Sequence, residues 1–339
     1  MDTFDGETAD FAWRKAADRF KGAHGASDQS SRAGQTSELL HAAFVIRNPA
    51  QRWVVSRRPA ISVAFAIVEA IGILSGRHDA RFFNYWNPSL PKYAGHVDTY
   101  PGAYGFRLRH HFGFDQLERA YLALKNKQHS RQVVLQIWDS AVDMPTPEGH
   151  PTSEDIPCNI CSMLKIRDDK LEWTQIIRSN DLFRGVPYNF VQFTSLQEVV
   201  AGWLGVKVGS YTQVADSLHV YQRDLKAVLD YASAEPILNT DSLCLAKSAF
   251  DVVLNCMVEH INDLAGPDLT QEDVRSIFQE EQLPLGYRNL LAVVAAEGAR
   301  RRGWPDLASE AMVVCTNPIL KELWKNWITR NRRGTPVII

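Results

Sequence analysis

Hydrophobic and polar positions alternate with a period of two in the middle of the chain and with a helical period on either side. Helical apolar spacing is found at residues 61–74, 114–126 and 189–204. Strand-like runs occupy residues 39–47, 132–138, 159–166, 171–177 and 206–214. From about residue 220 to residue 331 the pattern is almost entirely helical, with prolines at the breaks. A strand-rich middle between helices predicts an α+β fold.

Three segments lack such a period and are expected to be turns or loops. Residues 22–37 are small, polar and Gly-rich, which predicts a mobile loop. Residues 82–105 mix prolines, glycines and aromatics, which indicates an irregular segment over a pocket. The sequence Arg-Asp-Asp-Lys at 167–170 is a turn that joins two strand-like runs.

Composition describes a globular protein without a general affinity for polyanions. The 339 residues are 45% hydrophobic, and 37 basic residues nearly balance 39 acidic ones. Nucleic-acid binding would normally require a basic stripe, so we expect none. The most apolar run, 60–74, is interrupted by Glu69 and is too short to span a membrane. Five cysteines and the absence of an apolar leader favour a reducing compartment, and we expect the cytoplasm.

Candidate chemistry centres on Cys158, which follows a proline at the start of a predicted strand. The thiolate form of such a cysteine is a nucleophile, and a nearby guanidinium would favour it. Arg178 and Arg131 can each form forked, charge-assisted hydrogen bonds to a phosphate. The Cys158–Cys161 pair also matches the first half of a zinc or redox motif. A second Cys or His pair of suitable spacing is missing from the sequence, so we expect no metal.

Three residues further along could bind a nucleoside. The planar amide of Asn189 offers one acceptor and one donor, which matches the N3–H and O4 edge of uracil. Asn189 could instead cap the helix that follows it. His219 and Tyr221 are two apart, so they would share one face of a strand and could both reach a sugar hydroxyl.

These residues and their spacing resemble the thymidylate synthase and deoxycytidylate hydroxymethylase family. Asn189 and His219 lie at the offsets from Cys158 that the family shows. Further resemblance is carried by Glu69 in the helix at 68–76, by the segment 101–105, by Ser130-Arg131, by Arg32 and by the last residues, 334–339. The resemblance implies a mixed sheet covered by helices, with an extended helical C-terminal region.

The resemblance also implies a reaction and a set of functional residues. The reaction is transfer of a one-carbon unit from 5,10-methylenetetrahydrofolate to C5 of a pyrimidine nucleoside monophosphate, with dUMP and a homodimeric enzyme as the expectation. The implied catalytic residues are Cys158, Glu69, Asn189, Tyr104 and Asp181. The implied substrate-binding residues are Arg32, Arg131, Arg178, Ser179, Asn189, His219 and Tyr221. The implied cofactor-binding residues are Asp181, Gly185 and Ile339.

The resemblance implies four parts of the chain, and the sequence differs from the family pattern in two places. We expect a flexible N-terminal segment at 1–30, a catalytic core at 31–225, a helical region at 226–331 and a tail at 332–339 that closes the active site. Gln132 stands where a second phosphate-binding arginine often follows Ser-Arg. The helical region does not resemble the shorter C-terminal part of ordinary thymidylate synthases.

Two alternatives to dUMP methylation stay open. In a pyrimidine nucleotide 5-hydroxymethylase acting on dUMP, dCMP or CMP, water rather than hydride captures the exocyclic methylene group. The segments 178–181 and 217–221 look closer to hydroxymethylases, whereas Asn189 and the tail look closer to thymidylate synthases. The second alternative is an inactive relative whose helical region binds a partner.

Overall fold

The computed structural model describes residues 1–21, 26–31, 34–232 and 236–332, with side chains up to residue 330. In this part of the chain, one seven-stranded mixed sheet has the order β1-β3-β7-β6-β5-β4, and β2 pairs with β3. The strands are β1 (Asp2–Gly6), β2 (Ser27–Ser31), β3 (Gly34–Ile46), β4 (Val134–Gln136), β5 (Asn159–Arg167), β6 (Lys170–Asp181) and β7 (Lys207–Tyr221). The β1–β3 and β6–β7 pairs are parallel and the others antiparallel.

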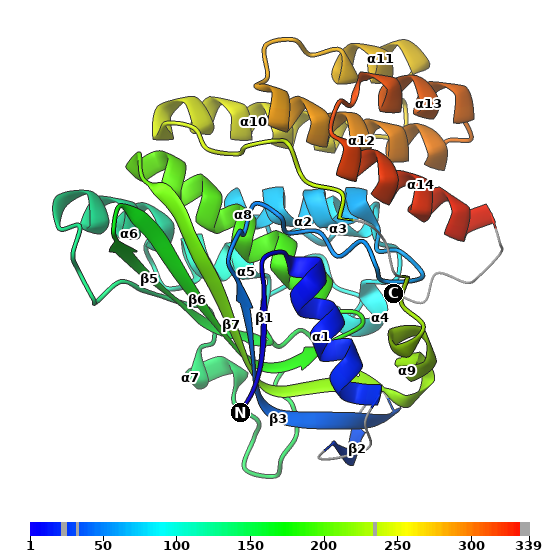
Figure 1. Ribbon diagram of the computed structural model, residues 1–339. Helices are drawn as coiled ribbons and strands as arrows, with labels where there is room; N and C mark the ends of the chain where they lie inside the picture. The colour runs from blue at the N-terminus through cyan, green and yellow to red at the C-terminus, as the bar shows by residue number, and fades with distance from the viewer. Residues whose placement is uncertain (22–25, 32–33, 233–235, 333–339) are drawn as a thin grey trace.

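Helices cover the sheet in two layers, so the predicted α+β class is confirmed (Figure 1). The helices α2 and α8 form the layer next to the sheet, and α10 to α14 lie beyond them. The helices are α1 (Ala9–Lys21), α2 (Val63–Leu74), α3 (Ala80–Asn84), α4 (Pro91–Ala94), α5 (Tyr104–Phe106), the π-helix η1 (Arg107–His111), α6 (Gln116–Asn126), α7 (Ser140–Asp143), α8 (Val186–Leu204), α9 (Gln222–Leu229), α10 (Lys247–Leu264), α11 (Gln271–Phe278), α12 (Leu285–Arg301), α13 (Pro305–Val314) and α14 (Pro318–Arg332).

The N-terminal segment, predicted to be flexible over 1–30, instead contains an ordered strand and an ordered helix. β1 pairs with β3 over its whole length. One face of α1 is buried, and its fully buried Trp13 donates a hydrogen bond from the indole nitrogen to the carbonyl of Leu182 at 2.7 Å. The helical spacing of small apolar residues on α1 explains this docking. β2 and the start of β3 likewise form antiparallel strands inside the predicted loop at 22–37.

Local sequence accounts for the two elements that carry most of the candidate site. α2 is buried on nearly every side, and the Ser62 hydroxyl caps it by accepting from the Phe65 backbone N–H at 3.2 Å. The predicted turn between β5 and β6 is confirmed, with Asp168 and Asp169 at φ of 49° and 57°. Aspartate tolerates this left-handed conformation better than most residues, and two such residues suit a tight hairpin.

The helical region is packed into the same core as the sheet. Most of 222–332 is helical, as predicted, but the described residues of 230–246 form an extended segment without a helix. One cluster of buried apolar side chains runs through both the predicted core and the helical region. Arg330 of α14 donates to the Ala60 carbonyl at 2.9 Å, just before α2, and Arg301 of α12 donates to the Trp86 carbonyl at 2.7 Å.

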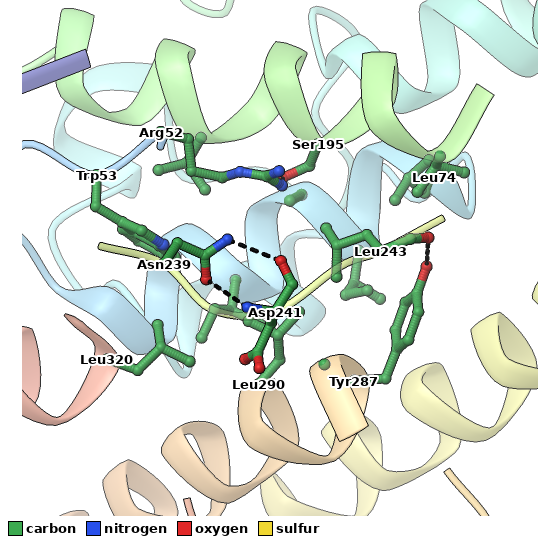
Figure 2. Close-up of a pocket in the computed structure, with 16 residues that line it drawn as sticks. Arg52, Trp53, Leu74, Ser195, Asn239, Asp241, Leu243, Tyr287, Leu290 and Leu320 are labelled. Carbon is green, nitrogen blue, oxygen red and sulfur yellow. Dashed lines mark hydrogen bonds between the residues drawn. The ribbon is translucent and has the colours of Figure 1, made fainter. Parts of the chain in front are cut away.

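Figure 2 shows the contact between the helical region and α2 and α8, where a cavity of about 30 Å³ lies. Arg52 donates to the Ser195 hydroxyl at 2.7 Å, and Tyr287 of α12 donates to the Leu243 carbonyl at 2.7 Å. Such a volume holds about one or two water molecules. Cys158 does not line this cavity, so the candidate site lies elsewhere. In the described part of the chain, we find no helix that combines the length and apolarity of a membrane span.

Candidate active site

Cys158 directly precedes β5, and Arg178 on the adjacent strand β6 lies beside it. The backbone N–H of Arg178 donates to the Cys158 carbonyl at 2.9 Å. The Arg178 side chain donates from Nε to the Pro157 carbonyl at 3.1 Å, and its Nη2 lies 3.9 Å from the Cys158 sulfur. Its guanidinium also stacks over the Trp138 ring at 5.3 Å. This arrangement holds a positive charge beside a partly accessible thiol, which suits a nucleophilic cysteine.

Tyr104, which is partly exposed, and the buried Asn159 lie near the same sulfur. Burial, reinforced by the proximity of Cys158, raises the pKa of Tyr104 far above its ordinary value, so its hydroxyl stays protonated. Asn159 is fully buried, and its side-chain oxygen accepts from Gln175 at 2.9 Å. Asn159 also lies near the Tyr104 hydroxyl, but its Nδ2 meets no acceptor with hydrogen-bond geometry in the described structure.

Tyr104 reaches this place because α5 presses against the backbone of α2. A side chain at Gly105 would lie 2.7 Å from the Gly72 carbonyl oxygen, so only glycine fits there. The close packing of Gly105 against α2 therefore explains why the segment 101–105 needs glycine at this position. Asn159 and Gln175 were missed in the sequence because nothing local shows that a polar residue on a strand will be buried.

Glu69, Gln192 and Asn189 form a chain of polar groups between α2 and α8. Asn189 donates from Nδ2 to the Gln192 side-chain oxygen at 3.0 Å. Burial raises the pKa of Glu69 to about 7, and hydrogen bonding from the Gln192 amide acts in the opposite direction. The Oε2 atom of Glu69 remains buried without a hydrogen-bond partner. Gln192 was not predicted, although the i, i+3 spacing from Asn189 places both on one helix face.

We expect the stability of the wild type, relative to a Glu69→Gln variant, to fall as the pH rises. The folded-state pKa of Glu69, about 7, lies above its ordinary value of 4.5, so folding favours the protonated form. The stabilisation is complete below pH 4.5 and is lost as the pH rises through about 7. The loss is at most about 3 kcal/mol, and the partial solvent contact of Glu69 reduces it. Urea unfolding of both proteins from pH 4.5 to 8 measures it; parallel pH profiles would contradict the assignment.

Asp181 and His219 are paired positions on the parallel strands β6 and β7. Asp181 Oδ1 accepts from the backbone N–H groups of Phe183 and Arg184 at 2.8 and 3.0 Å, which orders the loop before α8. Its Oδ2 is buried without a hydrogen-bond partner. Burial raises the pKa of Asp181 and lowers that of His219, while attraction between the two groups opposes both shifts.

The predicted sharing of one strand face by His219 and Tyr221 is found in the structure. Their rings meet edge to face with centroids 5.5 Å apart. Ser179 of β6 is paired with Ser217 of β7, two residues before the Asp181–His219 pair. Gly185 passes so close to Asn180 that a side chain there would lie 2.7 Å from the Asn180 side-chain oxygen. These residues therefore gather at one end of β6 and β7, close to the start of α8.

Three predicted residues are not joined to this cluster. Arg131 is exposed in the loop between α6 and β4, and no hydrogen bond or ion pair of the described structure links it to Cys158 or Arg178. Arg32 and Ile339 lie outside the described residues, as does nearly all of the predicted tail at 332–339. Within the described ranges, His, Cys, Asp and Glu side chains form no group of three that could hold a metal ion.

Several buried side-chain atoms of these elements have no hydrogen-bond partner in the described structure. They include Glu69 Oε2, Asn159 Nδ2, Asn180 Nδ2 and Asp181 Oδ2. Such atoms are rare in folded proteins because each costs roughly 1–3 kcal/mol when it is left unpaired. Both donors and acceptors are present in the set. The site therefore suits a ligand with several hydrogen-bonding groups of both kinds.

Three relatives show resemblance over part of the chain. A protein named deoxyuridylate hydroxymethyltransferase from Pseudomonas phage M6 is 34% identical over 202 residues, which cover 58% of this chain and 56% of that protein. A protein of the same name from Bacillus phage SP01 is 32% identical over 58% of this chain and 53% of its own length. A putative thymidylate synthase from Methanothermobacter marburgensis is 30% identical over 63% of this chain and 90% of its own length.

The chain thus spans about half the length of the two phage proteins that it matches. The family model described as thymidylate synthase matches residues 23–263. This range contains the cysteine with its arginine, the Glu69–Gln192–Asn189 chain and the His219–Tyr221 pair, and it extends into α10 of the helical region. Because the match covers well over half of its residues, the chain belongs to the thymidylate synthase family.

Proposed function

We propose that this protein transfers a one-carbon unit from 5,10-methylenetetrahydrofolate to C5 of dUMP. The observation that carries the proposal is the placement of the Cys158 sulfur 3.9 Å from a guanidinium nitrogen of Arg178, near the polar side chains of Tyr104, Asn159 and Glu69. A nucleophilic thiol alone fits many reactions. A thiol next to an anion-binding arginine and an amide suited to a uracil edge fits covalent activation of a pyrimidine nucleotide.

In the proposed reaction, Cys158 adds through its sulfur to C6 of the ring, and the electrons of the C5–C6 double bond move toward O4. C5 then becomes nucleophilic, and the Asn189 amide stabilises the charge on O4 because it is held in place before the reaction begins. C5 bonds to the methylene carbon that methylenetetrahydrofolate would supply, the bond from that carbon to the folate nitrogen breaks, and C5 loses its proton. The exocyclic methylene group would then take a hydride from the tetrahydrofolate, for methylation, or the oxygen of a water molecule, for hydroxymethylation. Glu69 moves protons to and from the ring, and the Tyr104 hydroxyl, which stays protonated, donates a hydrogen bond there. Departure of the Cys158 sulfur restores the double bond.

The remaining residues bind the two substrates in this proposal. Arg178 binds the phosphate, together with Ser179, Arg131 and Arg32. His219 and Tyr221 bind the 3′-hydroxyl. The Oδ2 of Asp181, which has no hydrogen-bond partner in the described structure, is a buried acceptor that suits an N–H donor of the folate pterin, and Gly185 packs closely against Asn180 beside it. Ile339 would close the site from the tail.

The product is dTMP in the first candidate function and 5-hydroxymethyl-dUMP in the second. Methylation is supported by the resemblance of Asn189 and of the tail to thymidylate synthases. Hydroxymethylation is supported by two relatives with 34% and 32% identity, both named deoxyuridylate hydroxymethyltransferase. Both functions share the Cys158 adduct and differ only in whether hydride or water captures the exocyclic methylene group.

Mass spectrometry of the reaction products distinguishes these functions. The protein is incubated with methylenetetrahydrofolate and, separately, with dUMP, dCMP, UMP and CMP, with a folate-free reaction as the control. We expect modification of dUMP, and the mass of the product identifies a methyl or hydroxymethyl group. Modification of dCMP or CMP in preference to dUMP would overturn the substrate proposal. A protein that binds nucleotide but modifies none of the four would support the inactive, partner-binding alternative.

We also propose a homodimer in which each active site takes Arg131 from the partner. Alternate positions on the central strands remain partly accessible and line up across the sheet, as in the rows Cys161–Ile176–Val214 and Met163–Thr174–Thr212. Helices α2 and α8 lie against the sheet (Figure 1), but these side chains remain partly exposed. A face with apolar and Thr side chains of this kind is suited to pairing with a second copy.

Mixing two inactive variants tests this arrangement. We expect Arg131→Ala and Cys158→Ser to be inactive alone and to regain activity when their subunits are exchanged, because a mixed dimer holds one site with both wild-type side chains. Light scattering measures the oligomeric state in parallel. A fully active monomer, or a mixture that stays inactive although mixed dimers form, would contradict the shared site.

A further inference from the structure

Asn189 and Gln192 lie one turn apart on α8, and both side chains are buried, at 7% and 3% exposure. The Nδ2 group of Asn189 donates to the Gln192 oxygen at 3.0 Å. An asparagine amide is nearly symmetric in shape, so packing hardly distinguishes its two orientations. Hydrogen bonds from its neighbours must therefore choose the orientation that the ligand meets.

The neighbour beyond Gln192 is a carboxylate. Glu69 lies on α2, which packs directly against α8, and the Gln192 amide is a hydrogen-bond donor toward it. The hydrogen bond from Gln192 lowers the pKa of Glu69 against the effect of burial and so favours its ionised form, which only accepts hydrogen bonds and draws the NH₂ group of Gln192 toward α2. The Gln192 oxygen then faces Asn189, which is the arrangement that the 3.0 Å hydrogen bond shows. Glu69 therefore sets the orientation of the Gln192 amide, and Gln192 in turn sets the orientation of the Asn189 amide.

The orientation of the Asn189 amide determines which hydrogen-bond donor and acceptor it presents to a bound base. One N–H of its amide is taken by Gln192, which leaves one N–H donor and the Oδ1 acceptor. Uracil offers the complementary pair, the O4 acceptor and the N3–H donor. Cytosine offers an amino donor at C4 and an acceptor at N3, which would require the reversed amide. A reversed Asn189 would place its oxygen against the Gln192 oxygen, which is unfavourable.

We propose that Gln192 is a positioning residue that holds the Asn189 amide in the orientation that selects uracil over cytosine. The inference rests on the proposed function, because it needs a pyrimidine to be read by Asn189. Gln192 does not touch the base in this proposal. It acts through Asn189, and it links the choice of base to the same carboxylate that serves in proton transfer.

The test compares Gln192→Met with Gln197→Met. Both residues are buried on α8, but Gln197 donates only to backbone carbonyls, among them Leu171 at 2.8 Å, away from Asn189. Methionine has nearly the same length and lacks the amide. We expect the kcat/KM ratio for dUMP over dCMP to fall roughly tenfold or more in Gln192→Met and to stay unchanged in Gln197→Met. An unchanged ratio in Gln192→Met, or an equal fall in both variants, would overturn the proposal.

A double-mutant cycle separates positioning from a structural effect. In an Asn189→Ala background, Gln192→Met should leave the ratio unchanged, because its effect passes through the Asn189 amide. A further fall of the same size in that background would overturn the proposal. Calorimetry also measures the dissociation constants of dUMP and dCMP. These constants test the role of Gln192 independently of the proposed reaction, because they do not require turnover. A wild type that binds dUMP selectively but modifies no nucleotide refutes the proposed reaction, while its binding ratio still tests Gln192.

Discussion

Replacing Cys158 by serine is expected to lower turnover of dUMP by about 10⁴-fold or more while leaving dUMP affinity within a few-fold of wild type. The thiolate forms the bond to C6 in the proposed reaction, and a serine hydroxyl is far less ionised and less nucleophilic. Phosphate, sugar and base are bound by other residues, so the nucleotide should still bind. Single-turnover kinetics and calorimetry with dUMP measure the two quantities.

Cys161→Ser is the matched control for this variant. Cys161 is the other half of the Cys-x-x-Cys pair and lies on β5, opposite Ile176. Burial raises the pKa of its thiol, which keeps it in the unreactive protonated form. We expect this control to keep its activity. Substantial turnover by Cys158→Ser would remove Cys158 from its proposed position in the reaction, and loss of activity in both variants would point to a joint function of the pair.

Asn189→Asp is expected to move the preference of the enzyme from dUMP toward dCMP, changing the kcat/KM ratio by roughly 100-fold or more. An aspartate at this place can accept a hydrogen bond from the cytosine amino group, whereas it repels O4 of uracil. The effect is large because the groups are buried, and a mismatched donor or acceptor there stays unpaired. Kinetics of both nucleotides with both proteins measure the ratio.

The wild-type ratio is itself a test of this interpretation. If the unaltered protein favours dCMP, the Asn189 amide does not read the base as proposed, and the substrate assignment fails. The Asn189→Ala variant serves as the control, since it removes the amide without offering a new acceptor. It should lower kcat/KM for both nucleotides and bring their ratio toward one.

Much of the candidate site follows from short-range patterns in the sequence. The period of two places His219 and Tyr221 on one strand face, and their rings do meet. The turn at 167–170 sets the hairpin register as far as Cys161, and a register shift between Asn159 and Cys161 then brings the backbone of Arg178 opposite that of Cys158. The strand face and the hairpin depend on hydrogen bonding within one hairpin and on strand geometry. Local sequence patterns therefore predict them.

The sequence by itself therefore determined the α+β class, the family and most of the residues around Cys158, because those depend on motifs and on local periods. Only the tertiary structure showed that the N-terminal segment is ordered, that Asn159 is buried beside Tyr104, and that Gln192 connects Glu69 to Asn189. Each of these features depends on a contact between elements far apart in the chain. Burial and hydrogen bonding across such contacts are set by how α2, α8 and the sheet pack, and local periodicity carries no information about that packing.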